Sequence, residues 1–190
     1  KADIHDSLFR QQRLSGHAEA AVKADRVWNG LGRLNWGPSH ATFKGALGAT
    51  GDQLEVDFNI ADLKPFDDQW TGQVEGSATF SGRMRHPGVV LDARATGLEG
   101  PHQLGIGNAS LTARVVPDLN APLMVEARLD KAKLGDLGVD HVTLSVSGTG
   151  RVNRGKLAVA GTELALQASL AGGLDREMAW QGTLEQLKLD

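Results

Sequence analysis

Apolar and polar residues alternate with a period of two through most of this chain of 190 residues. Residues 54–60 show the pattern most clearly, because Leu54, Val56, Phe58 and Ile60 are separated by three polar residues. Successive side chains of a β-strand point to opposite faces of a sheet, so such a segment has one apolar and one polar face. The alternation therefore predicts half-buried β-strands rather than amphipathic helices.

About twelve segments of this kind follow one another, with glycine, proline and polar turn residues between them. Short turns between strands favour antiparallel neighbours, and polar outer residues are typical of an antiparallel sheet with one wet face. No long helical pattern interrupts the series. The sequence therefore predicts an all-β, mainly antiparallel fold.

The first 27 residues are the least regular part of the chain. A short helix at residues 18–25 is one interpretation, because alanine and glutamate favour helices. We prefer a strand over residues 13–23, since Ala18, Ala20 and Val22 share one parity. We expect leading strands over residues 1–27 and one continuous sheet over residues 28–190.

Residues 163–189 predict a β-hairpin. Apolar residues alternate up to Leu170, a glycine-rich charged turn is expected at residues 172–177, and a second alternation begins at Met178. The apolar parity then shifts between Leu184 and Leu187, which are three positions apart. Because an extra residue in one strand produces such a shift, we expect a β-bulge near residues 185–186.

Composition narrows the classes of function. The chain contains no cysteine, which excludes disulfides, thiolate chemistry and cysteine-based metal sites. Its net charge of −3 provides no electrostatic basis for binding nucleic acid or an acidic membrane surface. No apolar run approaches the roughly 20 residues that a membrane-spanning helix needs. The first residues do not resemble a signal peptide and are typical of the interior of a longer protein.

Residues that could carry out chemistry are scattered. Glu55 and Asp57 lie on the polar parity of a strand, without the cleft that a glycosidase pair needs. No nucleophile elbow, phosphate-binding loop or dinucleotide-binding loop is present. The densest basic cluster, Arg83, Arg85 and His86, falls at a predicted turn, where a solvated turn is favoured over a binding patch. The histidines occur singly: His5, His17, His40, His86, His102 and His141. We therefore expect no enzyme activity, no catalytic residue, no metal site and no cofactor.

An apolar sheet face must be covered by another layer or by a ligand. The alternatives are a closed barrel, a sandwich, or a sheet that curls around something apolar. Glycines recur on the apolar parity, at Gly45, Gly76, Gly148 and Gly182, and would permit strong curvature. These observations leave the three alternatives open, although composition alone favours the core of an ordinary sandwich.

Three long segments resemble the TamB family of periplasmic proteins. Residues 161–189 are similar to a pattern near the C-terminal part of that family, in which a Trp-x-Gly-x-Leu strand (residues 180–184) ends in Leu-x-Leu (residues 187–189). Residues 32–63 and 70–98 resemble the same family. The likeness extends from about Trp28 onward, and it suggests an internal or C-terminal-half segment of a longer protein.

The resemblance implies an elongated, strongly curved sheet that forms a U-shaped apolar trough, called a β-taco. It also implies a parent protein in the periplasm, anchored in the inner membrane of a Gram-negative bacterium. Its expected role is to shield the acyl chains of phospholipids during transport toward the outer membrane. The expected partners are a phospholipid or other acyl-chain ligand and, through parts of the parent outside this segment, a TamA-like outer-membrane barrel.

Residues on the apolar parity of the most regular segments are the candidates for the groove lining. They are Leu54, Val56, Phe58, Ile60, Val74, Phe80, Val125, Leu144, Val146, Leu164, Leu166, Leu170, Trp180 and Leu184. The alternative function is an assembly factor that offers strand edges to outer-membrane proteins such as autotransporters. A more distant alternative, a surface adhesin or β-solenoid, would require regular repeats.

Overall fold

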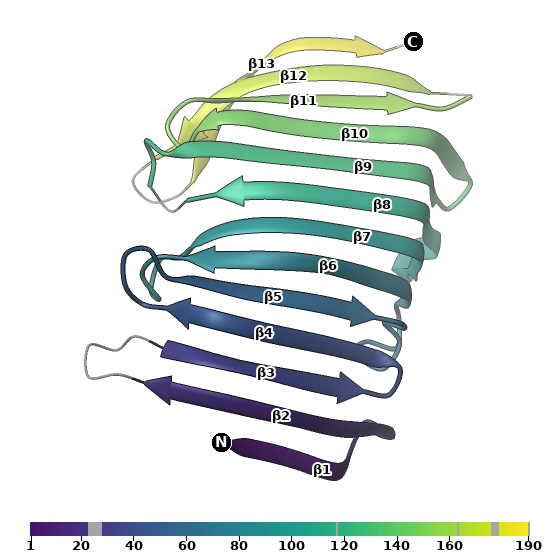
Figure 1. Cartoon of the computed structure of the whole chain (residues 1–190). Helices are drawn as coiled ribbons and strands as arrows, with labels where there is room; N and C mark the ends of the chain where they lie inside the picture. Colours follow the sequence, from purple (N-terminus) through teal and green to yellow (C-terminus); the bar gives the residue numbers. More distant parts are fainter. Residues whose placement is uncertain (23–27, 117, 163, 176–178, 190) are drawn as a thin grey trace.

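The computed structural model describes residues 1–22, 28–116, 118–162, 164–175 and 179–189. Within them, thirteen β-strands form a single sheet, and each strand pairs with its neighbours in the sequence (Figure 1). The strands are β1 (Ala2–Phe9), β2 (Gln12–Val22), β3 (Trp28–Trp36), β4 (Ser39–Leu47), β5 (Gln53–Ile60), β6 (Thr71–Ser81), β7 (Gly88–Gly100), β8 (Leu104–Val115), β9 (Pro122–Leu134), β10 (Leu137–Thr149), β11 (Asn153–Ala160), β12 (Ala165–Leu174) and β13 (Trp180–Leu189).

Every neighbouring pair of strands is antiparallel. The only helical element in the described part is a 3-10 turn, η1 (Pro101–Gln103), between β7 and β8. In the strand order β1 and β13 lie at opposite edges, so the sheet is open and curved rather than closed into a barrel (Figure 1). The predicted all-β, antiparallel, trough-like fold is therefore confirmed.

The N-terminal part forms strands and not a helix. Residues 2–22 contribute β1 and β2 to the same sheet as the rest of the chain. The preferred strand over residues 13–23 corresponds to β2, although Lys23 lies outside the described residues. The division of the chain at residue 28 stays a prediction.

One predicted turn proves to be continuous strand. Gly172 and Gly173 do not form the predicted turn, because they belong to β12 and pair with Gly182 and Gln181. These glycines resemble a turn signal, yet each is a position where a neighbouring group approaches the backbone closely.

The predicted bulge in the last hairpin is confirmed. Ser169 pairs with Gln186 and Leu170 pairs with Leu184, so Glu185 has no opposite partner. The extra residue shifts the parity of β13 and keeps Leu184 and Leu187 on the same face. Met178, which was expected to begin this strand, lies outside the described residues.

A crease crosses β7, β8, β9 and β10 near one end of the strands. Here the spacing between apolar residues changes from two to three: the row Ala95, Ala109, Leu129 and Val142 is followed by the row Leu98, Ile106, Ala132 and Val139. Between the rows, Gly97 (φ 62°) and Lys131 (φ 55°) adopt left-handed backbone conformations. A left-handed residue interrupts the extended backbone, so these strands bend at the crease, toward the right of Figure 1.

Candidate functional site: the apolar face of the sheet

The strand register joins apolar residues into two adjacent rows that cross the whole sheet. The first row is Ala2, Ala18, Gly32, Phe43, Val56, Ala78, Leu91, Ala113, Val125, Val146, Gly155, Leu170 and Leu184. The second row is Ile4, Gly16, Leu34, Ala41, Phe58, Gly76, Ala93, Leu111, Ala127, Leu144, Leu157, Ala168 and Leu187. Neither row contains a polar side chain, so apolar surface continues from one edge of the sheet to the other.

The residues between these rows point to the opposite face and are all polar. They are Asp3, His17, Arg33, Thr42, Asp57, Ser77, Asp92, Thr112, Glu126, Ser145, Lys156, Ser169 and Gln186. The two faces of this sheet therefore differ in chemistry along its whole length. In such a sheet one face is apolar and the other face is exposed to water.

Most of the predicted groove residues lie on the apolar face. Val56, Val125, Val146, Leu170 and Leu184 belong to the first row, and Phe58 and Leu144 to the second. A third row begins with the pair Ile60 and Val74 and contains Leu166, and the pair Leu54 and Phe80 lies on the other side of the first row. Segments that are distant in the sequence thus meet on one surface. Contact of these residues with a lipid stays a prediction.

Two predicted groove residues lie outside these rows. Leu164 precedes β12 and so is not a strand residue; its carbonyl oxygen accepts a hydrogen bond from Gly161 N at 2.9 Å. Trp180 pairs with Leu174 at the start of β13. A Cβ atom at Gly172 or Gly182 would come within 2.6 or 2.3 Å of the Trp180 ring, so the ring lies across these two glycines.

Other aromatic rings also lie on glycines of neighbouring strands. A Cβ atom at Gly32 would come within 2.5 Å of the Phe43 ring, and one at Gly76 within 2.9 Å of the Phe58 ring. Since real side chains do not approach so closely, glycine is needed at both positions for the rings to lie along the sheet. In each pair the aromatic ring lies over a glycine, so this large side chain lies along the sheet instead of projecting from it.

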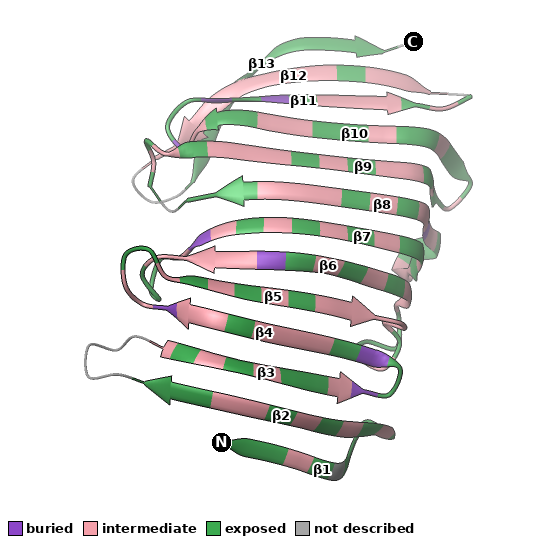
Figure 2. Cartoon of the chain, in the orientation of Figure 1, coloured by how far each residue is buried: buried purple, intermediate pink, exposed green. Residues whose placement is uncertain are grey.

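The apolar face is incompletely covered. The chain exposes 12687 Å², whereas a compact protein of this mass would expose about 8,700 Å². Trp36, Leu47 and Ala78 are the only apolar residues in the described part that count as buried, and most of the sheet is intermediate or exposed (Figure 2). The fold therefore has a floor of half-buried apolar side chains instead of a closed dry core.

One end of the apolar face is covered by the chain itself. Residues 61–70, between β5 and β6, place the Phe66 ring edge-on against Trp36, with 4.0 Å between the ring centroids. The Arg10 guanidinium, in the β1–β2 turn, donates hydrogen bonds to the carbonyl oxygens of Pro65 (3.0 Å) and Phe66. Trp36 Nε1 donates to the Phe9 carbonyl oxygen at 3.0 Å. The loop thus crosses from β5–β6 to the β1–β2 turn over an aromatic cluster.

At the other end of the strands, a buried polar residue lies on the apolar side. Asn153 is 4% exposed, and its Oδ1 accepts a hydrogen bond from Trp180 Nε1 at 3.1 Å. Asn153 Nδ2 donates to the carbonyl oxygens of Thr149 (3.2 Å) and Gly150 (3.4 Å). Because all of its polar atoms have partners, Asn153 can be buried without a large desolvation penalty, and it connects the β10–β11 turn to β13.

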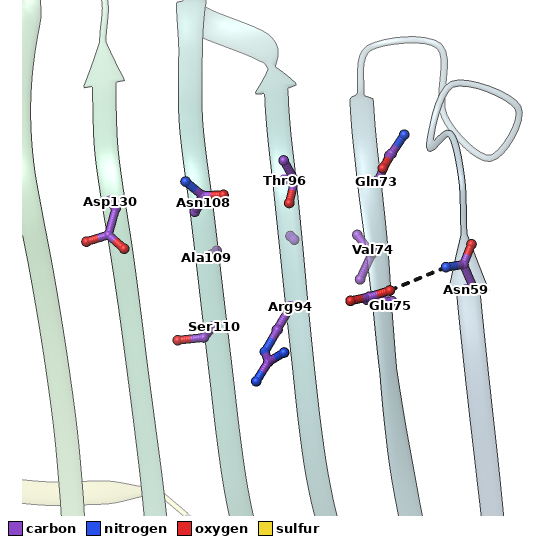
Figure 3. Close-up of a pocket in the computed structure, with 11 residues that line it drawn as sticks. Asn59, Gln73, Val74, Glu75, Arg94, Thr96, Asn108, Ala109, Ser110 and Asp130 are labelled. Carbon is purple, nitrogen blue, oxygen red and sulfur yellow. Dashed lines mark hydrogen bonds between the residues drawn. The ribbon is translucent and has the colours of Figure 1, made fainter.

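The polar face contains open hollows. One of about 300 Å³ is lined by Asn59, Glu75, Arg94, Asn108 and Asp130, among others (Figure 3). In it, Asn59 Nδ2 donates to Glu75 Oε2 at 3.5 Å, and a hydrogen bond from His141 Nδ1 lowers the pKa of Asp130. The described residues contain no group of three or more His, Asp or Glu side chains that could hold a metal ion. These hollows are exposed and their side chains bind one another, so the apolar face is the stronger candidate site.

A chain of ionic contacts joins the first two strands on the polar face. His17 Nδ1 lies 2.5 Å from Asp3 Oδ1, and Lys1 Nζ lies 2.5 Å from Glu19 Oε1. The hydrogen bond with Asp3 raises the pKa of His17 above its ordinary value of 6.5, and the same bond lowers the pKa of Asp3 below 3.8. The pairing of β1 with β2 is therefore strongest when His17 is protonated and Asp3 is deprotonated.

We predict that β1 is held most firmly between about pH 4 and pH 6.5. The contribution of His17 is complete below its unfolded pKa and is lost as the pH rises through its raised pKa. The contribution of Asp3 is complete above its unfolded pKa and is lost as the pH falls through its lowered pKa. Amide-exchange protection of residues 2–9, corrected for intrinsic rates, should fall as the pH rises above about 6.5. A His17→Gln variant that shows the same fall would contradict this explanation.

Together, these features define a class of protein: an open antiparallel sheet with an apolar trough on one face and a polar surface on the other. The chain matches the family model for TamB, N-terminal domain, over residues 4–190. It therefore belongs to the TamB family. The resemblance inferred from the sequence is confirmed, but the comparison with the C-terminal part is not supported, because the matching model describes the N-terminal domain.

No solved structure matches the chain significantly. The described part of the chain also contains no helix with the length and apolar character needed to cross a membrane.

Proposed function

We propose that this chain is a segment of a periplasmic bridge whose apolar trough shields the acyl chains of phospholipids during transport toward the outer membrane. The proposal rests on one observation above all, the two rows of apolar residues that cross every strand of the sheet. Family membership supports it, since a bridge-like role between membranes is expected of TamB proteins. The proposed activity is passive and requires no catalytic residue.

The dimensions of the trough suit this role. Thirteen strands about 4.8 Å apart give a floor about 58 Å long. One leaflet of a bilayer's hydrocarbon core is about 15 Å thick, so the floor is longer than a single extended acyl chain. A lipid that moves along the rows meets no polar side chain, and therefore no step at which its tails must be transferred to water.

The trough would bury part of each acyl chain without enclosing it. Each methylene removed from water contributes about 0.8 kcal/mol. Because the trough is open on one side, only part of each acyl chain is removed from water, and exchange with membranes remains feasible. The trough would thereby hold a lipid without trapping it.

Site-specific photo-crosslinking in cells tests the proposal. A photoreactive amino acid at position 58 should capture lipid, whereas one at position 57, which points to the polar face, should not. The two positions are adjacent in β5 and differ mainly in the face they occupy. Lipid capture at position 57 but not at position 58 would refute the proposal.

A second function, as an assembly factor for outer-membrane proteins such as autotransporters, is favoured by one feature. β1 and β13 lie at the edges of the sheet, and an edge strand offers unpaired backbone groups to another strand. Crosslinks from β1 or β13 to β-barrel proteins, without lipid capture at position 58, would favour this function. In either role, we expect a TamA-like barrel to be bound through other parts of the parent protein, which is anchored in the inner membrane.

A further inference from the structure

Two turns on the same rim of the trough combine arginine with exposed aliphatic side chains. The β6–β7 turn presents Arg83, Met84 and Arg85, and the β10–β11 turn presents Arg151 and Val152. Met84 is 50% exposed and Val152 is 72% exposed. An exposed aliphatic residue beside a guanidinium group is typical of surfaces at the boundary between lipid headgroups and acyl chains.

The loop between these turns adds a third exposed aliphatic residue. Val116, which is 50% exposed, follows the end of β8, and the same loop carries Asp118 in place of an arginine. The loop is joined to the β10–β11 turn, because Arg151 N donates a hydrogen bond to the Leu119 carbonyl oxygen at 2.8 Å. Two of the three successive connections on this rim thus combine arginine with an exposed aliphatic side chain, and the loop between them contributes Val116. We call residues 83–85, 116 and 151–152 the arginine rim.

The arginine rim adjoins the floor of the trough. Phe80, whose strand leads into the β6–β7 turn, pairs with Val89 on the apolar face, and Val89 pairs with Val115. The apolar surface therefore reaches the rim without an intervening polar residue. A ligand that bridges rim and floor would need a charged head and apolar tails.

The guanidinium groups of the rim have no carboxylate partner. The ion pairs found in the described part of the chain lie on β1–β2 and around Asp130, and none involves Arg83, Arg85 or Arg151. Unpaired guanidinium groups bind phosphate oxygens through two parallel hydrogen bonds, which a lysine cannot do.

The opposite rim has the opposite character. Its β5–β6 loop carries Asp62, Asp67 and Asp68 beside a single lysine, Lys64, and its β9–β10 turn carries Asp136. The arginine on that side, Arg10, is occupied by the carbonyl oxygens of the β5–β6 loop. An anionic headgroup would be repelled there.

We propose that the arginine rim binds the phosphate of a glycerophospholipid whose acyl chains lie in the trough. This assignment rests on the proposed function and adds that lipids enter with their headgroups on one side only. Met84, Val116 and Val152 then lie at the level where headgroup and acyl chains meet. The turn around Arg83 and Arg85, which the sequence pattern alone favours as merely solvated, becomes part of the site.

The test compares two lipids that differ only in the headgroup: a fluorescent-tailed phosphatidylglycerol and a diacylglycerol with the same acyl chains. The test variant carries Arg83→Glu, Arg85→Glu and Arg151→Glu. A control variant carries Lys44→Glu, Arg94→Glu and Lys156→Glu, three exposed positions on the polar face, and so has the same net charge. The Kd of each lipid is measured at low and high salt.

We expect the unmodified chain to bind the phospholipid about ten-fold more tightly than the diacylglycerol, with the difference shrinking at high salt. The rim variant should lose this preference and keep its Kd for diacylglycerol, while the control variant keeps both. An unchanged preference in the rim variant would overturn the proposal and leave the trough function standing. Failure of the unmodified chain to bind either lipid would instead refute the proposed function.

Two further outcomes are informative. If the rim variant loses binding to phosphatidylglycerol vesicles but keeps its preference for dispersed lipid, the rim docks on membranes and the headgroup assignment is wrong. If the rim variant also loses diacylglycerol binding, its trough is damaged, and the comparison is repeated with Arg83→Gln and Arg151→Gln. The same two Kd values then decide the question.

Discussion

A Phe58→Asp variant should lose lipid capture, with binding weakened by at least about ten-fold, because a carboxylate in an apolar groove lacks a hydrogen-bond partner. Phe58 lies in the middle of the second apolar row, and its ring rests on Gly76. The substitution removes the ring and places a charge in the path of the acyl chain. Equilibrium binding of a fluorescent fatty acyl probe would measure the effect, and Leu166→Arg should act in the same way in the third row.

The matched control is Asn59→Asp, the next residue of β5. It introduces the same charged group on the polar face, beside the exposed residues that line the hollow of Figure 3. Its affinity for the probe should remain within about two-fold of the unmodified chain, since a solvated charge carries little desolvation cost. Equal losses in the two variants would show that the apolar face is not the binding surface.

A Gly172→Val variant should be destabilised by about 2–4 kcal/mol, because the new side chain has no room. A Cβ atom at this position would lie 2.4 Å from the Gln181 carbonyl oxygen and 2.6 Å from the Trp180 ring. We expect the ring to be displaced, its hydrogen bond to Asn153 to break, and β13 to detach from β12. Denaturant unfolding and amide exchange over residues 180–189 would report these changes.

The control for this variant is Gly138→Val in β10. No atom lies within 4 Å of a Cβ atom built at Gly138, and valine favours strands. Its stability should therefore stay within about 0.5 kcal/mol of the unmodified chain. A similar loss in both variants would mean that flexibility of the glycine, rather than the close approach of Trp180, explains the sensitivity of Gly172.

Much of the fold could be predicted from local sequence pattern, because in a sheet of this kind each strand needs only its own alternation. The alternation of residues 54–60 corresponds to β5 (Gln53–Ile60), and the bulge at Glu185 follows from a single shift of parity. The face on which most groove residues lie could be predicted for the same reason.

Other features depend on contacts that a local pattern does not contain. Leu98, Ile106 and Ala132 join the apolar surface only because neighbouring strands share the crease. In the sequence alone, the change of spacing and the glycines at this place give no regular alternation. The contact of Arg10 with the β5–β6 loop joins parts of the chain separated by 55 residues. The arginine rim likewise becomes visible only when successive turns are seen to lie on one side of the sheet.

Because the strands pair strictly in sequence order, the length of such a sheet can change by the addition or loss of hairpins. Each strand pairs only with the strands before and after it, so one more hairpin would extend the sheet by about 9.6 Å and leave its cross-section unaltered. Growth of this kind needs no new partner elsewhere in the fold. The distance bridged is thereby set by the number of hairpins, a quantity that duplication or deletion of short gene segments can adjust in nearly uniform steps.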